Sequence, residues 1–151
     1  MDELEALYRS RFDAFARVAA TVAGEAARDA VQEGFATAVR KRRSFRGDGP
    51  LEAWVWRIVL NAARTQARRH RPDAGPRGSE PLTQTVSEEG EVRAAVAGLP
   101  ERQRLAVFLR YYADLDYDSI AAALGVKPGT VAASLHAAHS ALRGALLGVE
   151  G

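Results

Sequence analysis

The chain has 151 residues, of which 47% are apolar and 26% are charged, enough apolar residues for one ordinary domain or two small ones. It contains no cysteine, which excludes disulfides and cysteine-ligated metal sites and fits a reducing compartment. Charged residues interrupt every apolar run, and the first residues are acidic and amphipathic, so we expect neither a membrane span nor a signal peptide.

The net charge of +2 is distributed unevenly along the chain. Residues 1–72 contain 14 basic and 9 acidic residues, a balance of +5. Residues 73–91 contain one basic and five acidic residues, and residues 92–151 contain six and five. A basic first part, an acidic connector and a near-neutral last part indicate different partners for each part.

Apolar residues at helical spacing predict two helices at the start of the chain. The first covers residues 4–22 and ends before Gly24, which breaks the pattern. The second covers residues 25–43, and its outward face carries Asp29, Gln32 and Glu33 before it turns basic. Cations in the last turn complement the helix dipole, which is a sufficient structural reason for their presence.

A Gly/Pro loop at residues 46–50 precedes a third helix, whose pattern runs to Pro72. Its apolar stripe includes Trp54, which we assign mainly to the core. Other side chains leave the stripe: Trp56, Arg57, Asn61, Arg64 and Arg68. Guanidinium groups pair with phosphates and flat rings stack on unpaired bases, so this stretch suits a nucleic acid strand. The alternative is a half-buried helix with a solvated basic face.

Residues 73–91 are rich in Pro, Gly, Ser, Thr and Glu and read as a flexible linker. Helical patterns resume over residues 92–98, 99–112, 117–124 and 128–147. Asp116 is a suitable N-cap, Gly125 a turn residue and Pro128 a first helical residue. A short helix, a glycine turn and a longer helix form a helix-turn-helix pattern. We therefore predict an all-α chain with two small domains, residues 1–72 and 92–151.

No catalytic or metal-binding constellation is evident in the sequence. Asp114, Asp116 and Asp118 alternate like the start of a calcium loop, but Ser119 and Gly125 replace its required glycine and glutamate. His136 and His139 lie three apart without a Cys, Asp or Glu within a turn of them. We expect no enzyme activity, no cofactor and no metal.

Three segments together resemble the extracytoplasmic-function sigma factors, the small promoter-recognition subunits of bacterial RNA polymerase. They are DAVQEGF, then FRGDGPLEAWVWRIVLNAARTQARR, then LPERQRLAVFLRYYADLDYDSIAAALGVKPGTVAASLH, in the order typical of that family. The resemblance covers nearly the whole chain. It implies sigma region 2 at residues 1–72 and region 4 at residues 92–151, joined by a connector that threads through the polymerase.

The resemblance also implies roles for individual residues. Asp29, Gln32 and Glu33 match the face that docks on core RNA polymerase. The residues that match the part that reads and melts the minus-ten element are Arg46, Gly47, Asp48, Trp56, Arg57, Asn61, Arg64 and Arg68. Those that match the contacts to the minus-thirty-five element are Lys127, Pro128, Thr130, Ala133, Ser134, His136 and Ala137. The implied partners are core polymerase, promoter DNA and an anti-sigma factor, in the cytoplasm and without membrane insertion.

Two departures from the family pattern affect the expected DNA contacts. Thr65 stands where relatives often have an acidic residue. The last helix is nearly uncharged until Arg143, where relatives carry cations, so we expect a weak grip through Lys127, Thr130, His136 and backbone amides.

Two other functions stay open on the sequence alone. One is a stand-alone helix-turn-helix regulator, which the uncharged last helix disfavours. The other is a sigma-like interaction module that binds a regulatory protein.

Overall fold

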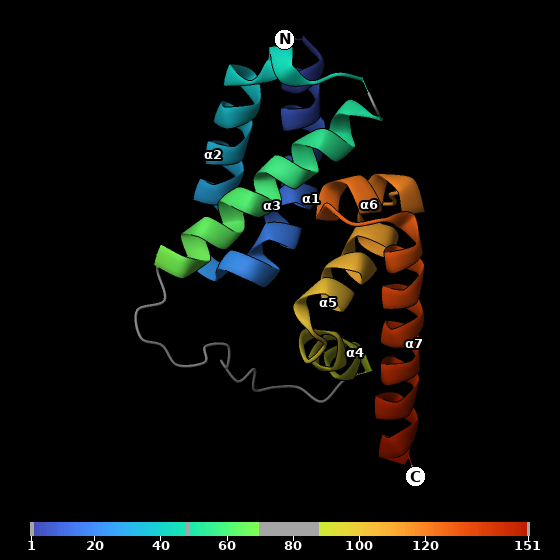
Figure 1. Ribbon diagram of the computed structural model, residues 1–151. Helices are drawn as coiled ribbons and strands as arrows, with labels where there is room; N and C mark the ends of the chain where they lie inside the picture. The colour runs from blue at the N-terminus through green and yellow to red at the C-terminus, as the bar shows by residue number, and fades with distance from the viewer. Residues whose placement is uncertain (1, 48, 70–87, 151) are drawn as a thin grey trace.

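The computed structural model describes residues 2–47, 49–69 and 88–150, which form helices joined by turns and loops (Figure 1). The first half consists of α1 (Asp2–Ala23), the 3₁₀ turn η1 (Gly24–Ala26), α2 (Ala27–Arg40), the 3₁₀ turn η2 (Arg42–Ser44) and α3 (Leu51–Arg69). The second half consists of α4 (Glu88–Ala97), α5 (Glu101–Val107), the π-helical turn η3 (Phe108–Tyr112), α6 (Tyr117–Leu124) and α7 (Pro128–Glu150). The predicted all-α class is confirmed.

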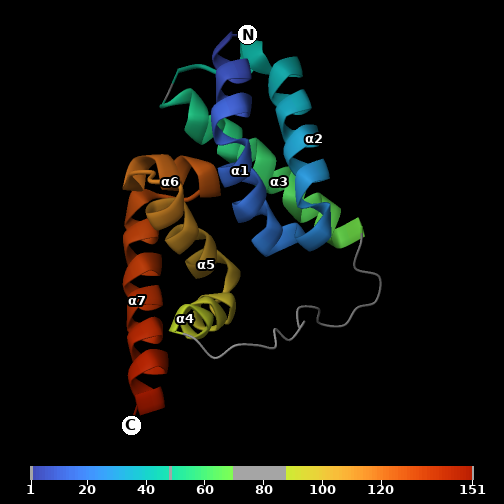
Figure 2. The same cartoon turned by 180° about the vertical axis from the view of Figure 1, so that it is seen from behind.

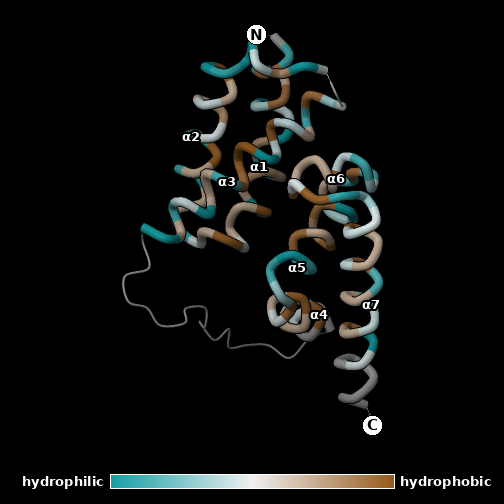
Figure 3. The backbone as a smooth tube through the Cα atoms, in the orientation of Figure 1, coloured by the Kyte–Doolittle hydropathy of each residue, from teal (hydrophilic) through white to brown (hydrophobic). Residues whose placement is uncertain are grey.

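The first half is a three-helix bundle in which α3 crosses α1 and α2, as the opposite views of Figures 1 and 2 show. Its centre is aromatic: Phe15 stacks on Trp56 with ring centroids 4.0 Å apart and meets Phe35 edge-on at 5.1 Å. Gly24, with φ of 59°, ends α1 as the sequence predicted. Figure 3 shows the hydrophobic segments of these helices turned toward one another.

Gly34 allows α2 and α3 to approach closely. A Cβ atom added there would lie 2.8 Å from both Cα and Cγ2 of Val59, closer than two carbon atoms can pack. We therefore expect Gly34→Ala to lower the free energy of unfolding by about 1–3 kcal/mol, the usual cost of overpacking. Denaturant unfolding measures the change.

Gly144→Ala is the matched control, because no atom lies within 4 Å of a Cβ added to this glycine of α7. It should stabilise the chain by up to about 1 kcal/mol through helix propensity alone. If the two substitutions change stability alike, the close approach at Gly34 is not a constraint.

The second half contains the expected helix-turn-helix. The Asp116 side chain caps α6 by accepting a hydrogen bond from the Ser119 amide at 2.8 Å. Gly125 ends α6 in the left-handed conformation, with φ of 72°, and α7 begins at Pro128. Ile120 and Ala121 of α6 share one buried cluster with Val131 and Leu135 of α7. Ala138 of α7 packs instead with Val96 and Leu99.

The cap of α6 makes stability depend on pH. The hydrogen bond from the Ser119 backbone amide, reinforced by the Ser119 hydroxyl and by Arg110, lowers the pKa of Asp116. A lowered folded-state pKa contributes stability above the unfolded pKa of about 3.9 and loses it as pH falls through the folded value. Asp116→Ala should therefore lower Tm at neutral pH and have progressively less effect below about pH 4.

Thermal unfolding followed by circular dichroism from pH 3 to pH 7 checks this expectation. Asp118→Ala, an exposed first-turn neighbour that does not cap the helix, should lower Tm less. A pH-independent effect of Asp116→Ala would contradict the assigned cause.

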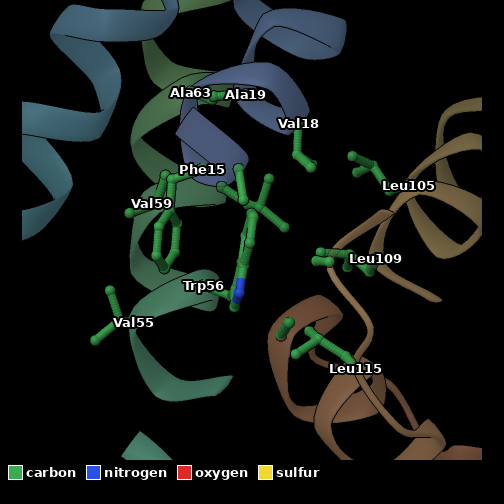
Figure 4. Packing of buried hydrophobic residues seen from close by; sticks show 14 of the residues in the cluster. Phe15, Val18, Ala19, Val55, Trp56, Val59, Ala63, Leu105, Leu109 and Leu115 are labelled. Carbon is green, nitrogen blue, oxygen red and sulfur yellow. The ribbon is translucent and has the colours of Figure 1, made fainter. Parts of the chain in front are cut away.

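The two halves share one hydrophobic core rather than lying apart. Phe15, Val18 and Trp56 of the first half belong to the same buried cluster as Leu105 and Leu109 of the second. Figure 4 shows these side chains facing one another across the two halves. The division into two domains stays a prediction. Most of the predicted linker lies outside the described residues, and its last residues, 88–91, belong to α4.

Candidate nucleic-acid interface

The loop before α3 and the first turns of that helix border a cavity of about 370 Å³. Its lining residues are Ser44, Phe45, Arg46, Gly49, Pro50, Ala53, Trp54, Arg57 and Ala122. The cavity therefore combines aromatic and guanidinium groups from the first half with one small residue of α6. Flat rings beside cations are the surface that an unpaired base and its phosphate require.

The two tryptophans of α3 have exchanged the roles that the sequence predicted for them. Trp56 is completely buried, and its Nε1 donates to Glu52 Oε2 at 3.0 Å. Trp54 is only half-buried and lines the cavity, with its ring centroid 5.2 Å from that of Phe45. The prediction that Trp56 leaves the apolar stripe is therefore wrong.

The physical reason is that α3 packs against two sets of helices. Residues two apart on a helix point about 200° apart, so only one tryptophan can face the centre of the bundle. The α3 helix meets α1 and α2 on one side and α6 on another. The buried stripe is therefore wider than one face and is shifted from the predicted one, through Ala53, Val55, Trp56, Val59, Leu60, Ala63 and Gln66.

The predicted minus-ten cations differ in their surroundings. Arg46, Arg57 and Arg68 are exposed, as is Gly47, whose φ is 81°. Arg64 is half-buried: its Nε donates to Glu101 Oε2 at 3.1 Å, and its Nη1 donates to Asn61 Oδ1 at 3.3 Å. Asp48 lies outside the described residues.

The predicted polymerase-docking face lies on α2, away from its buried side. Asp29, Gln32 and Glu33 are all exposed. Glu33 also accepts a hydrogen bond from Gln66 Nε2 at 3.0 Å, which ties it to α3. Substitution of Asp29 or Gln32 should therefore disturb the fold less than substitution of Glu33.

Most of the predicted minus-thirty-five residues are exposed at the start of α7. Lys127, Pro128, Ala133 and His136 are exposed, while Thr130 and Ala137 are half-buried. Ser134 is only 9% exposed, so its assignment to DNA contact is wrong.

Ser134 is buried because it lies on the same side of α7 as the buried Val131 and Ala138, three and four positions away. One contact was not expected from the sequence: His139 Nε2 lies 3.1 Å from the Tyr111 hydroxyl.

Sequence reasoning also missed three walls of the cavity. Phe45, which directly precedes the predicted loop, was given no role, Trp54 was predicted to be core, and Ala122 was predicted only to lie in the helix of residues 117–124. An aromatic directly before a Gly/Pro loop was the available signal for Phe45. No local signal identifies Ala122, because only the packing of α6 on α3 brings it there.

Within residues 2–47, 49–69 and 88–150, no helix is long and apolar enough to cross a membrane. No three His, Cys, Asp or Glu side chains gather there in a way that could hold a metal ion.

Comparison with known proteins places these features in a family. Residues 7–72 match the model of sigma-70 region 2, and residues 89–142 match that of sigma-70 region 4. The chain is 32% identical over 134 residues to the ECF RNA polymerase sigma-E factor of Escherichia coli strain K12, covering 76% of this chain and 70% of the relative. The chain belongs to the extracytoplasmic-function sigma factors.

A second relative and two solved structures agree with this assignment. The RNA polymerase sigma-H factor of Pseudomonas aeruginosa is 31% identical over 140 residues, covering 80% of this sigma factor and 72% of the relative.

The sigma factor RpoE of Bartonella quintana, solved with the anti-sigma factor NepR, shares the fold with a TM-score of 0.74 at 21% identity and covers 97% of this chain and 98% of its own. CnrH, solved with the cytosolic domain of CnrY, gives a TM-score of 0.71 at 23% identity, covering 98% and 89%. The resemblance seen in the sequence is confirmed.

Proposed function

We propose that this sigma factor binds core RNA polymerase and uses the cavity beside α3 to capture a base of the minus-ten element. The observation that carries the proposal is the aromatic pair Phe45 and Trp54 beside Arg46 and Arg57. A base that leaves the duplex can stack on the rings, and the guanidinium groups can take its phosphates. Lys127, Thr130, Ala133 and His136 of the helix-turn-helix would contact the minus-thirty-five element.

The chemistry of transcription belongs to the polymerase in this proposal, and the sigma factor needs no catalytic group or cofactor of its own. Its place of action would be the cytoplasm, where promoter DNA and polymerase meet. The names of the curated relatives support the polymerase partner. An anti-sigma factor is a further proposed partner, because a solved structure of the same fold contains one.

One experiment separates this function from the alternatives. The full chain is used to capture core RNA polymerase, and the complex is then tested for run-off transcription on genomic promoter fragments. Capture followed by promoter-specific transcripts supports the sigma-factor role. DNA binding without polymerase capture would indicate a stand-alone regulator, and capture of neither would indicate an interaction module.

The docking face gives a quantitative expectation. Asp29→Ala combined with Gln32→Ala should weaken polymerase binding. The two substitutions remove a charged carboxylate and an amide that would form hydrogen bonds with the partner. Both residues are exposed, so the free energy of unfolding should change by less than about 0.5 kcal/mol per substitution. Fluorescence anisotropy of the labelled chain with core polymerase measures the affinity.

Asp13→Ala is a control for the loss of one exposed carboxylate from the same half. It should leave polymerase affinity unchanged. Parental affinity in the double variant would remove this face from the proposed interface.

A further inference from the structure

The 3₁₀ turn η2, which precedes the cavity loop, places Arg42 against the ring of Phe45. The guanidinium carbon of Arg42 lies 5.7 Å from the ring centroid, within the distance of about 6 Å over which a cation is attracted to an aromatic face. A 3₁₀ helix has about three residues per turn, so side chains three positions apart lie one above the other. The Phe45 amide closes the turn by donating to the Arg42 carbonyl oxygen at 3.2 Å. Arg43, one position further along, is exposed.

The start of α1 holds Arg42 on another side. Arg42 Nη2 donates to Glu3 Oε1 at 3.3 Å, and the two side chains are 35% and 72% exposed. Figures 1 and 2 both show η2 beside the first turn of α1. Arg42 Nε is buried and has no hydrogen-bond partner among the described residues. The guanidinium is therefore packed beside the Phe45 ring and paired with Glu3, and it does not extend freely into solvent.

The ring that Arg42 contacts is one wall of the cavity. Phe45 lies against Trp54 with the ring planes tilted by 43°, and both half-buried rings line the cavity. Arg42 is not among the described residues that line it. The cation therefore contacts the aromatic wall from outside the cavity, in the series Arg42, Phe45, Trp54.

The backbone that follows Phe45 does little to fix the direction of its ring. Gly47 and Gly49 lie in this loop, and a Cβ atom added to either would meet no atom within 4 Å. A ring without support would lose its rotamer freedom when a base stacks on it, and that loss reduces affinity. A ring that is already held against Trp54 avoids most of this cost, so the contact with Arg42 bears directly on base capture.

We propose that Arg42 is a positioning residue for base capture, which holds the Phe45 ring against Trp54 before a base enters the cavity. Glu3 restricts the directions that the Arg42 guanidinium can take. The proposal rests on the function proposed above and adds to it a residue that contacts the aromatic wall and not the DNA.

The position of the ring is tested on the full chain without DNA. Para-fluorophenylalanine in place of Phe45 reports the surroundings of the ring by fluorine NMR, and the parent should give one resonance displaced by the neighbouring Trp54. Arg42→Met keeps an unbranched side chain without the charge and should move this resonance toward its position in the unfolded chain. Arg43→Met is the matched control, since it removes the same charge from an exposed residue of the same turn. It should leave the resonance in place.

The consequence for DNA is tested with the polymerase complex on a promoter found by run-off transcription. Arg42→Met should reduce open-complex formation on duplex DNA by about twofold to fivefold, the range of a cation–aromatic contact at an exposed site. Arg43→Met should reduce it less. Arg42→Lys keeps a cation and should recover part of the loss. In the presence of Phe45→Ala, Arg42→Met should have no further effect, because Arg42 acts through that ring.

Three results would overturn the proposal. They are an unmoved fluorine resonance in Arg42→Met, equal losses of promoter opening in Arg42→Met and Arg43→Met, and a loss from Arg42→Met that persists with Phe45→Ala. The last two would mean that Arg42 acts on DNA through its charge and not through the ring. If the parent opens no promoter, the proposed function fails, while the fluorine resonance still decides whether Arg42 holds the ring.

Discussion

Trp56→Ala is expected to lower the free energy of unfolding by about 3–5 kcal/mol, the usual cost of removing a large aromatic from a core. The ring is completely buried and stacks on Phe15, and the cluster around it includes residues of both halves. Its removal also leaves Glu52 without the indole donor. Chemical denaturation followed by circular dichroism measures the loss.

Trp56→Phe should recover part of that stability, because it restores ring contacts but not the hydrogen bond to Glu52. Near-parental stability of Trp56→Ala would mean that this ring is not central to the core. Impaired promoter binding by Trp56→Ala would follow from unfolding and would carry no information about base capture.

Trp54→Ala is expected to reduce open-complex formation on duplex promoters by about 5-fold to 150-fold, since stacking of one base on an aromatic ring is worth about 1–3 kcal/mol. Trp54 is half-buried on the wall of the cavity, so its loss should affect stability less than that of Trp56. On templates with a pre-melted bubble the defect should be smaller, because the cost of unpairing has been removed. Potassium permanganate footprinting of both templates measures the difference.

The matched control for this effect is Ile58→Ala. Ile58 lies one turn further along α3 and is also half-buried, but it does not line the cavity. Ile58→Ala should lower stability, but any defect in transcription should be the same on duplex and bubble templates. Trp54→Phe keeps an aromatic ring and should retain most promoter opening. Equal defects of Trp54→Ala on duplex and bubble templates, together with a lowered Tm, would assign Trp54 to the core.

Local signals in the sequence were sufficient to predict that the helices exist and to place the turn between α6 and α7, although α2 and α4 end or begin a few residues from the predicted positions. Asp116 caps α6, Gly125 takes the left-handed conformation and Pro128 begins α7, because each requirement involves only neighbouring residues. The order of the three sequence segments was sufficient to identify the family. The exposed faces of α2 and of the start of α7 also followed from helical spacing, since the opposite faces are apolar.

Only the tertiary structure decided which tryptophan of α3 is buried and which lines the cavity. Helical spacing places Trp54 and Trp56 on different faces, but both are apolar aromatics, and the choice depends on how α1, α2 and α6 pack around α3. The pairing of Arg64 with Glu101 and the position of Arg57 beside Gly125 likewise join residues far apart in the chain. These contacts form because apolar side chains of α3 and α5, far apart in the sequence, are buried in one core. A local pattern of residues does not show which distant segments will pack together.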